Sequence, residues 1–100
     1  MDVQIQSIHF DADVKLLDFT KKKVSKLNQY FDKIIDANVY FKLDDNSSQV
    51  REKVTHIKVN IPGNTLYASE TSLTFEEAVD NAVEALSRQL KKHKEKAKNS

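Results

Sequence analysis

Apolar and polar residues alternate in four short stretches of the chain, and this alternation predicts four β-strands. In the first stretch, residues 3–10, Val3 and Ile5 alternate with glutamines. The alternation slips at Ser7, which indicates either a bulge or the end of the strand. Each of the other three stretches has an apolar and a polar face, as half-buried strands do, and they span residues 37–45, 50–61 and 65–71.

Two longer stretches place apolar residues at the 3.6-residue period of an amphipathic helix. The first helix is expected from about Asp13 to Phe31, with Asp13 as its N-cap. Thr74 and Glu77 form a capping box at the start of the second helix, which nothing interrupts before about Ala97. The apolar stripes consist of Leu16, Leu17, Thr20, Val24, Leu27 and Phe31 in the first helix and of Phe75, Val79, Ala82, Val83, Leu86 and Leu90 in the second. The length of the second helix predicts that its last turns project past the sheet.

Two connections complete the predicted order of elements. Residues 44–49 have the composition of a loop, and Pro62-Gly63, the only proline and the only glycine, marks a tight turn. The order β-α-β-β-β-α predicts an α+β fold, in which two helices pack on the apolar face of a four-stranded sheet. We expect one domain over residues 1–100, because no linker or repeat divides the chain.

The amino-acid composition indicates the cellular compartment in which the protein is expected. No stretch approaches the roughly 20 apolar residues of a membrane span, and the first ten residues do not resemble a signal peptide. Cysteine is absent, which excludes disulfides and thiolate metal sites and agrees with a cytosolic protein. We therefore expect a cytoplasmic location and no membrane partner.

Positive charge is concentrated in two segments of a nearly neutral chain. The sequence holds sixteen cations and fifteen acids, for a net charge of +1. Six cations lie in residues 88–100, where Glu95 is the single acid, and six lie in residues 15–33 beside two acids. Compensation of the helix dipole accounts for two or three cations at a helix end, but not for six. The two basic segments therefore indicate contact with an anionic partner.

The basic segments favour nucleic acid as that partner. If both helices lie side by side on the sheet, their outer sides form one basic ridge that suits backbone phosphates. Lysine dominates the ridge, and Tyr40 and Tyr67 do not form the paired aromatic motif of an RNA-recognition sheet, so recognition is expected to depend on shape and phosphates. Two alternatives remain open: a protein–protein interaction module that uses the ridge against an acidic partner, and a general double-stranded RNA-binding domain.

Catalytic and metal-binding motifs are missing from the sequence. His9, His56 and His93 are not at metal-ligand spacing, and one glycine cannot build a phosphate-binding loop. The acid pairs Asp44-Asp45 and Glu76-Glu77 fit a solvated loop and the first turn of a helix. We expect no enzyme activity, metal, cofactor or small-molecule substrate.

Three stretches of the chain are distinctive: "KKVSKLNQYFDKI" (22–34), "HIKVNIPGNTLYAS" (56–69) and "LTFEEAVDNAVEALSRQLKKHKEK" (73–96). They resemble the ribosome hibernation promoting factor family, which includes ribosome-associated inhibitor A. The resemblance implies a ribosome-binding domain that occupies the mRNA and tRNA channel of the small subunit, stops translation under stress or in stationary phase, and stabilises or dimerises idle ribosomes. It implies rRNA contacts by Lys23, Lys26, Arg88, Lys91, Lys92 and Lys94, with Lys22 and Lys96 as looser matches.

The sequence also departs from the family pattern. It ends at Ser100, short of the additional C-terminal domain of long members and of the acidic tail of the inhibitor type. Dimerisation with a second ribosome is therefore expected to need an auxiliary factor. Position 17 is Leu where a basic residue is expected, so the first helix is expected to contact rRNA somewhat differently.

Overall fold

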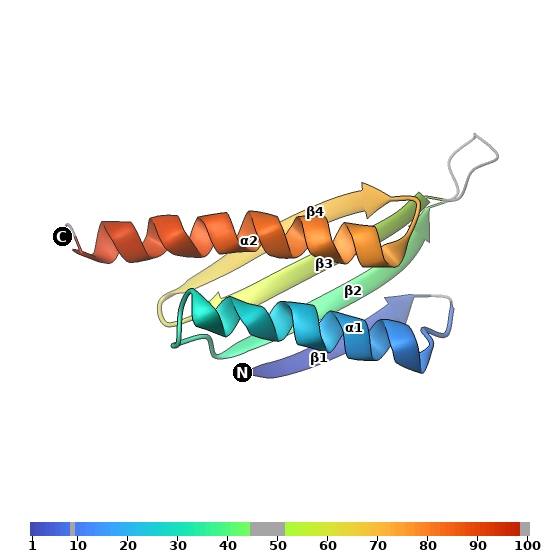
Figure 1. The fold of residues 1–100 in the computed structure, drawn as a ribbon, viewed down its shortest axis with the longest axis horizontal. Coiled ribbons are helices and arrows are strands. Elements are labelled where there is room, and N and C mark those ends of the chain that lie inside the picture. Colours follow the sequence, from blue (N-terminus) through green and yellow to red (C-terminus); the bar gives the residue numbers. More distant parts are fainter. Residues whose placement is uncertain (9, 45–51, 99–100) are drawn as a thin grey trace.

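The fold is a four-stranded sheet with two helices on one face, as Figure 1 shows. The computed structural model describes residues 1–8, 10–44 and 52–98. Its elements, in chain order, are β1 (Asp2–Ile8), α1 (Val14–Ser25), the 3-10 helix η1 (Lys26–Gln29), β2 (Asp36–Asp44), β3 (Glu52–Ile61), β4 (Asn64–Ser72) and α2 (Phe75–Lys98). The predicted order and α+β class are confirmed.

The strands follow the chain order β1-β2-β3-β4 across the sheet. β1 pairs with β2 in parallel, and the two later pairs are antiparallel. A parallel pair needs a crossover connection, and here that connection contains α1. The antiparallel strands β3 and β4 need only Pro62 and Gly63 between them, with Ile61 opposite Asn64 in the register and Gly63 at φ +77°. The predicted tight turn is confirmed.

Alternation along the strands separates a core face from an open face. Val39, Ile57 and Ala68 lie side by side in the register and are buried beneath the helices. Their neighbours Lys58 and Tyr67 are paired on the opposite face and are exposed. The core therefore lies between the sheet and the helices. It includes the whole apolar stripe predicted for the second helix and the stripe predicted for the first helix except Leu17, which is only partly buried and lies outside the core.

The first predicted helix is shorter and more tightly wound at its end than the sequence indicates. Asp13 caps it as expected, its Oδ1 accepting a hydrogen bond from the Leu16 N–H at 2.8 Å. The α-helix ends at Ser25, however, and η1 follows, so the single helix predicted to Phe31 is wrong. A 3-10 helix aligns residues three apart, which keeps Leu27 on the same buried side as Val24.

Three further boundary predictions have different outcomes. β1 ends at Ile8, so the slip in alternation marks the end of the strand. Asp44, the first residue of the loop predicted at 44–49, is instead the last residue of β2, so the loop prediction is wrong at that position. The rest of the predicted loop lies outside the described residues, as do His9 and the first two residues of the strand predicted from Val50.

The second helix runs past the sheet. Thr74 Oγ1 accepts a hydrogen bond from the Glu77 N–H at 3.1 Å, as expected for its N-cap. α2 spans 24 residues and extends beyond the turn between β3 and β4 (Figure 1). Its final turns are therefore accessible on several sides. Neither described helix combines the length and the apolar character that a membrane span requires.

Candidate nucleic-acid interface

The two helices run in the same direction along the sheet. Three contacts join them in the same order along both segments: Lys23 with Asp80, Tyr30 with Lys91, and Phe31 with His93. Figure 1 shows α1 and α2 side by side, both beginning near the same end of the molecule. The C-terminal parts of both helices therefore point toward one end.

This arrangement sorts the charges by position along the molecule. The first half of α2 contains four acids and no cation, and its second half contains all six cations of the C-terminal segment. Acids at the start and cations at the end both complement the dipole of the helix. Because the helices run in parallel, the basic part of α2 lies next to the end of the first helical segment, which consists of α1 and η1 (residues 14–29). The end of the first basic segment thus lies beside the cations of α2, whereas Lys23 lies beside Asp80 in the acidic half of α2 and Lys15 lies near the start of α1.

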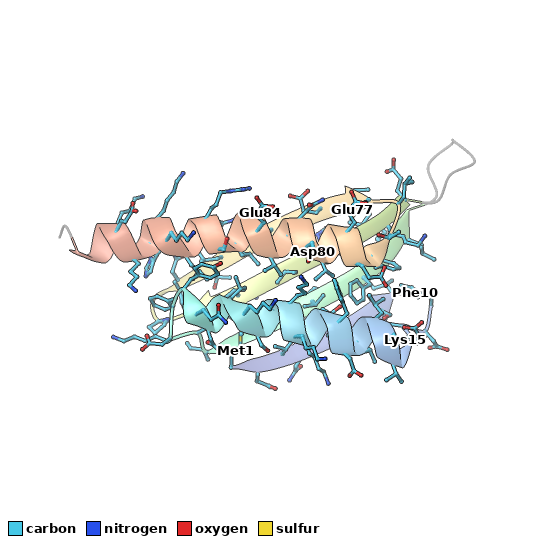
Figure 2. The ribbon with its side chains drawn as sticks, viewed as in Figure 1. Met1, Phe10, Lys15, Glu77, Asp80 and Glu84 are labelled. Carbon is cyan, nitrogen blue, oxygen red and sulfur yellow. The ribbon has the colours of Figure 1, made fainter. Side chains whose placement is uncertain are left out.

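Lys23 lies in the seam between the helices. Its Nζ is 3.2 Å from Asp80 Oδ1, and its ammonium lies 5.5 Å from the centre of the Phe19 ring. The exposed fraction of its side chain is 33%, against 50% for Asp80. Figure 2 shows Asp80 on the side of α2 that faces α1, whereas Glu77 and Glu84 lie on the far side. The Lys23 ammonium is therefore partly engaged in contacts within the protein itself.

Lys22 and Lys26 lie on the outer side of the first helical segment. Both are exposed, and together with Lys21, Ser25 and Gln29 they line a shallow groove on its surface. Among the described residues, neither forms an ion pair. These two cations are the site residues of this segment that are most available to a ligand.

The site residues of α2 point in different directions around the helix. Arg88 Nη1 lies 3.1 Å from Glu84 Oε1, and both side chains are largely exposed. The Lys91 ammonium lies 4.9 Å from the centre of the Tyr30 ring. Lys94 lines a pocket on the η1 side of the helix.

Lys92 and Lys96 lie on the other side of α2. They line a hollow with Asn64 and Leu66 of β4. The predicted single ridge is therefore a broader basic end. In it, the chain's own acids engage Lys23 and Arg88. Two further cations, Lys22 and Lys26, lie on the outer side of the first helical segment, and the others, Lys91, Lys92, Lys94 and Lys96, surround the late turns of α2.

Sequence reasoning missed the acids within the interface. Glu84 is four residues before Arg88, a spacing that allows an ion pair on a helix and was readable from the sequence. Asp80 pairs with Lys23, which lies 57 positions away in the chain, so no local sequence pattern predicts this ion pair. Lys21 and Lys33 also line hollows beside predicted site residues, although neither is among the residues predicted to contact rRNA.

The open sheet face carries a smaller cluster of polar aromatic residues. Tyr67 Oη and His56 Nδ1 are 3.2 Å apart, and Tyr40 is opposite His56 in the register. Over the described residues, no three acids or histidines approach in a way that could hold a metal ion. The basic end remains the described surface with the greatest concentration of charged side chains.

Residues 3–98 match the family described as Sigma 54 modulation protein / S30EA ribosomal protein. The chain belongs to this family. It is 33% identical to the Ribosome hibernation promoting factor of Escherichia coli, with 98% of each chain covered. It is 32% identical to the protein of the same name from Pseudomonas putida, over 96% of this chain and 89% of that one. The resemblance to the hibernation factor family seen in the sequence is confirmed.

One relative is much longer. The Ribosome hibernation promotion factor of Deinococcus radiodurans is 29% identical over 91% of this chain, which corresponds to 48% of the relative. The chain thus spans about half the length of that protein. The relatives are named for ribosome hibernation and not for a catalysed reaction.

Solved structures share the fold. A ribosomal subunit interface protein from Coxiella burnetii superposes with a TM-score of 0.83 at 26% identity, covering 94% of this chain and 98% of that one. The N-terminal domain of Thermus thermophilus Protein Y gives a TM-score of 0.81 at 23% identity, with 93% and 99% covered. The mixed sheet with two helices on one face is therefore a fold that this chain shares with both solved structures.

Proposed function

We propose that this chain is a ribosome-binding domain that attaches to the small ribosomal subunit through its basic end and keeps idle ribosomes inactive. The observation that carries the proposal is the parallel arrangement of the helices, which places the end of the first basic segment beside the lysines of α2. Family membership supports the ribosome as the target. Lysine contacts to phosphate suit a folded RNA that is recognised by shape.

The proposed binding place is the channel that mRNA and tRNA would occupy. Bound there, the protein blocks translation by occupying space and catalyses no reaction. Such a role places it in the cytoplasm, under stress or in stationary phase. Dimerisation of ribosomes would need a second ribosome and an auxiliary factor, because the basic end is already engaged with the first ribosome.

The rRNA contacts are assigned to two groups of residues. The first comprises cations whose side chains are free to reach phosphates: Lys22, Lys26, Lys92, Lys94 and Lys96. The second comprises cations that also contact the protein itself, namely Lys23, Arg88 and Lys91. Members of the second group are held in position before binding, so they lose less conformational freedom when they meet RNA.

Cosedimentation with purified small subunits tests the proposal. We expect binding that tRNA displaces. With about five phosphate contacts, the affinity should fall several-hundred-fold between about 50 and 200 mM salt. Binding that excess tRNA leaves unchanged would contradict the channel location. Equal competition by an unrelated RNA duplex would favour a general double-stranded RNA binder, and competition by an acidic polypeptide alone would favour a protein partner.

A further inference from the structure

A pocket lies on the η1 side of the last turns of α2. It has a volume of about 360 Å³ and is lined by Phe31, Asp32, Lys33, Pro62, His93 and Lys94. These residues come from three separate places in the chain: the segment after η1, the turn between β3 and β4, and α2. The tertiary fold alone therefore creates the pocket.

Flat rings form part of its wall. The Phe31 and His93 rings meet edge to face, with centroids 5.5 Å apart and planes at 80°. In such a pair, the ring that contributes its edge keeps both faces free of its partner. Phe31 and His93 are each partly exposed, and Pro62 is exposed. The wall thus offers flat surfaces against which another ring can stack.

Cations flank these flat surfaces. Lys33 and Lys94 line the pocket and are exposed, whereas Asp32 is the single acid among the lining residues. Lys91 lies on the neighbouring turn of α2, above the Tyr30 ring. The pocket therefore combines an apolar stacking surface with positive charge at its rim, which suits a ligand that has an aromatic ring and a phosphate.

We propose that this pocket binds one unpaired nucleotide of RNA, with its base against Phe31, His93 and Pro62 and its phosphate near Lys33 and Lys94. A base inside a duplex has both faces covered by its neighbours, so only an unpaired base can use the stacking surface. The volume is near the lower end of the roughly 300–1,000 Å³ of small-ligand pockets, which suits one nucleotide and excludes a double helix. This inference rests on the proposed function and adds an unpaired nucleotide to the shape-based contacts.

Binding of a short single-stranded RNA to Phe31→Leu and to the unaltered protein tests the pocket. Leu keeps an apolar side chain but removes the aromatic face, so affinity should fall about tenfold, as expected for the loss of one base–aromatic stack. The affinity of Phe31→Leu for a blunt RNA duplex should stay within twofold of that of the unaltered protein. Tyr67→Leu on the open sheet face is the matched control and should bind the single strand normally. Equal affinity of Phe31→Leu and the unaltered protein for the single strand would overturn the inference.

A second variant tests the pocket independently, so that the test does not depend on the folding of Phe31→Leu. Lys33→Gln with Lys94→Gln alters only exposed side chains. It should weaken single-strand binding while the melting temperature stays unchanged. Backbone amide shifts of His93 and Lys94 in NMR spectra should move when the RNA is added. Larger shifts with an acidic peptide of equal charge would overturn the inference in favour of a protein ligand.

Cosedimentation separates failure of the pocket from failure of the proposed function. If the unaltered protein binds small subunits and both pocket variants bind single-stranded RNA as it does, the pocket inference fails and the proposed function stands. If the unaltered protein does not bind small subunits, the proposed function fails. In that case the oligonucleotide experiment still decides whether the pocket accepts an unpaired nucleotide.

Discussion

Lys23 and Asp80 join the two helices through an ion pair in which Lys23 Nζ lies 3.2 Å from Asp80 Oδ1. The pair lies in the seam of a surface that we propose to bind RNA. The acid therefore has two opposing effects: it holds Lys23 in place, and it adds a negative charge that repels phosphate. A partly exposed pair of this kind contributes about 0.2–1 kcal/mol to stability, so its effect on binding should exceed its effect on folding.

Replacing Asp80 by Asn should strengthen RNA binding. The change frees Lys23 and removes a negative charge, so affinity for small subunits should rise several-fold at low salt. The slope of log affinity against log salt should steepen by up to about one, the increment for one additional phosphate contact. The control is Asp2→Asn on β1, which removes the same charge away from the helices. A weaker Asp80→Asn complex would mean that the position of Lys23 matters more than its freedom.

Reversing two outer cations should abolish binding without unfolding the protein. Lys22→Glu with Lys26→Glu changes exposed side chains on the groove of the first helical segment. Cosedimentation with small subunits should be lost, while the melting temperature stays within a few degrees. The matched control is Lys42→Glu with Lys58→Glu, an equal change of charge on the open sheet face. Similar losses in both double variants would point to net charge, and not to the basic end.

Charge reversal at Lys23 differs from charge reversal at its neighbours. Lys23→Glu places a second carboxylate against Asp80 in the seam, so we expect a lower melting temperature as well as weaker binding. Addition of Asp80→Lys to the same chain restores an ion pair of opposite polarity. This double variant should regain most of the melting temperature. If the melting temperature is not regained, the seam between the helices does not accommodate the ion pair with its two charges exchanged.

The Lys91–Tyr30 contact should contribute modestly to stability. A cation over an aromatic ring at an exposed site is worth about 0.5–1 kcal/mol. A double-mutant cycle with Lys91→Ala and Tyr30→Leu, measured by urea unfolding, should give a coupling free energy in that range. Lys91→Arg should retain it. Coupling near zero would show that Lys91 leaves the ring in solution and is free for RNA.

Two buried threonines should respond oppositely to the same substitution. Thr20 Oγ1 donates a hydrogen bond to the Leu16 carbonyl oxygen at 2.7 Å, whereas Thr55 Oγ1 is buried with no hydrogen-bond partner among the described residues. Thr55→Val should therefore raise the free energy of unfolding by about 1 kcal/mol, because it removes an unsatisfied hydroxyl. Thr20→Val should be neutral or destabilising. Destabilisation by Thr55→Val would indicate a water or side-chain partner for Oγ1.

Gly63 should be needed for its backbone conformation alone. Its φ is +77°, and a Cβ placed on it would meet no atom within 4 Å. Gly63→Ala should therefore lower the free energy of unfolding by about 1–2 kcal/mol, the cost of a left-handed conformation for an ordinary residue. Gly63→Asn should cost less, because Asn tolerates this region better. Equal losses for both variants would indicate that the turn changes shape.

Much of the fold could be predicted from local patterns. The alternation of Val39, Tyr40 and Phe41 reports which side of a strand is buried. Asp13 and Thr74 accept hydrogen bonds from residues only three positions later. The end of α1 at Ser25 escaped prediction, because a 3-10 turn and an α-turn accommodate the same apolar residues.

The candidate site was only partly predictable. The sequence identifies the lysines and the helical face on which each lies, since both follow from residue type and the helical period. The fold determines that the helices run in parallel, that Asp80 meets Lys23, and that Phe31 and His93 close one pocket. A period along one helix says which side a residue occupies, but it carries no information about what lies opposite.

The amino-acid sequence by itself thus determined the elements, their buried faces and the presence of two basic segments. Only the tertiary structure decided which charges are engaged, which remain free, and where flat rings and cations come together. The physical reason is the sequence separation between the residues that each kind of interaction joins. Hydrogen-bonded caps and burial periods arise between near neighbours in the chain, whereas ion pairs and pockets between helices depend on how distant segments pack across the sheet.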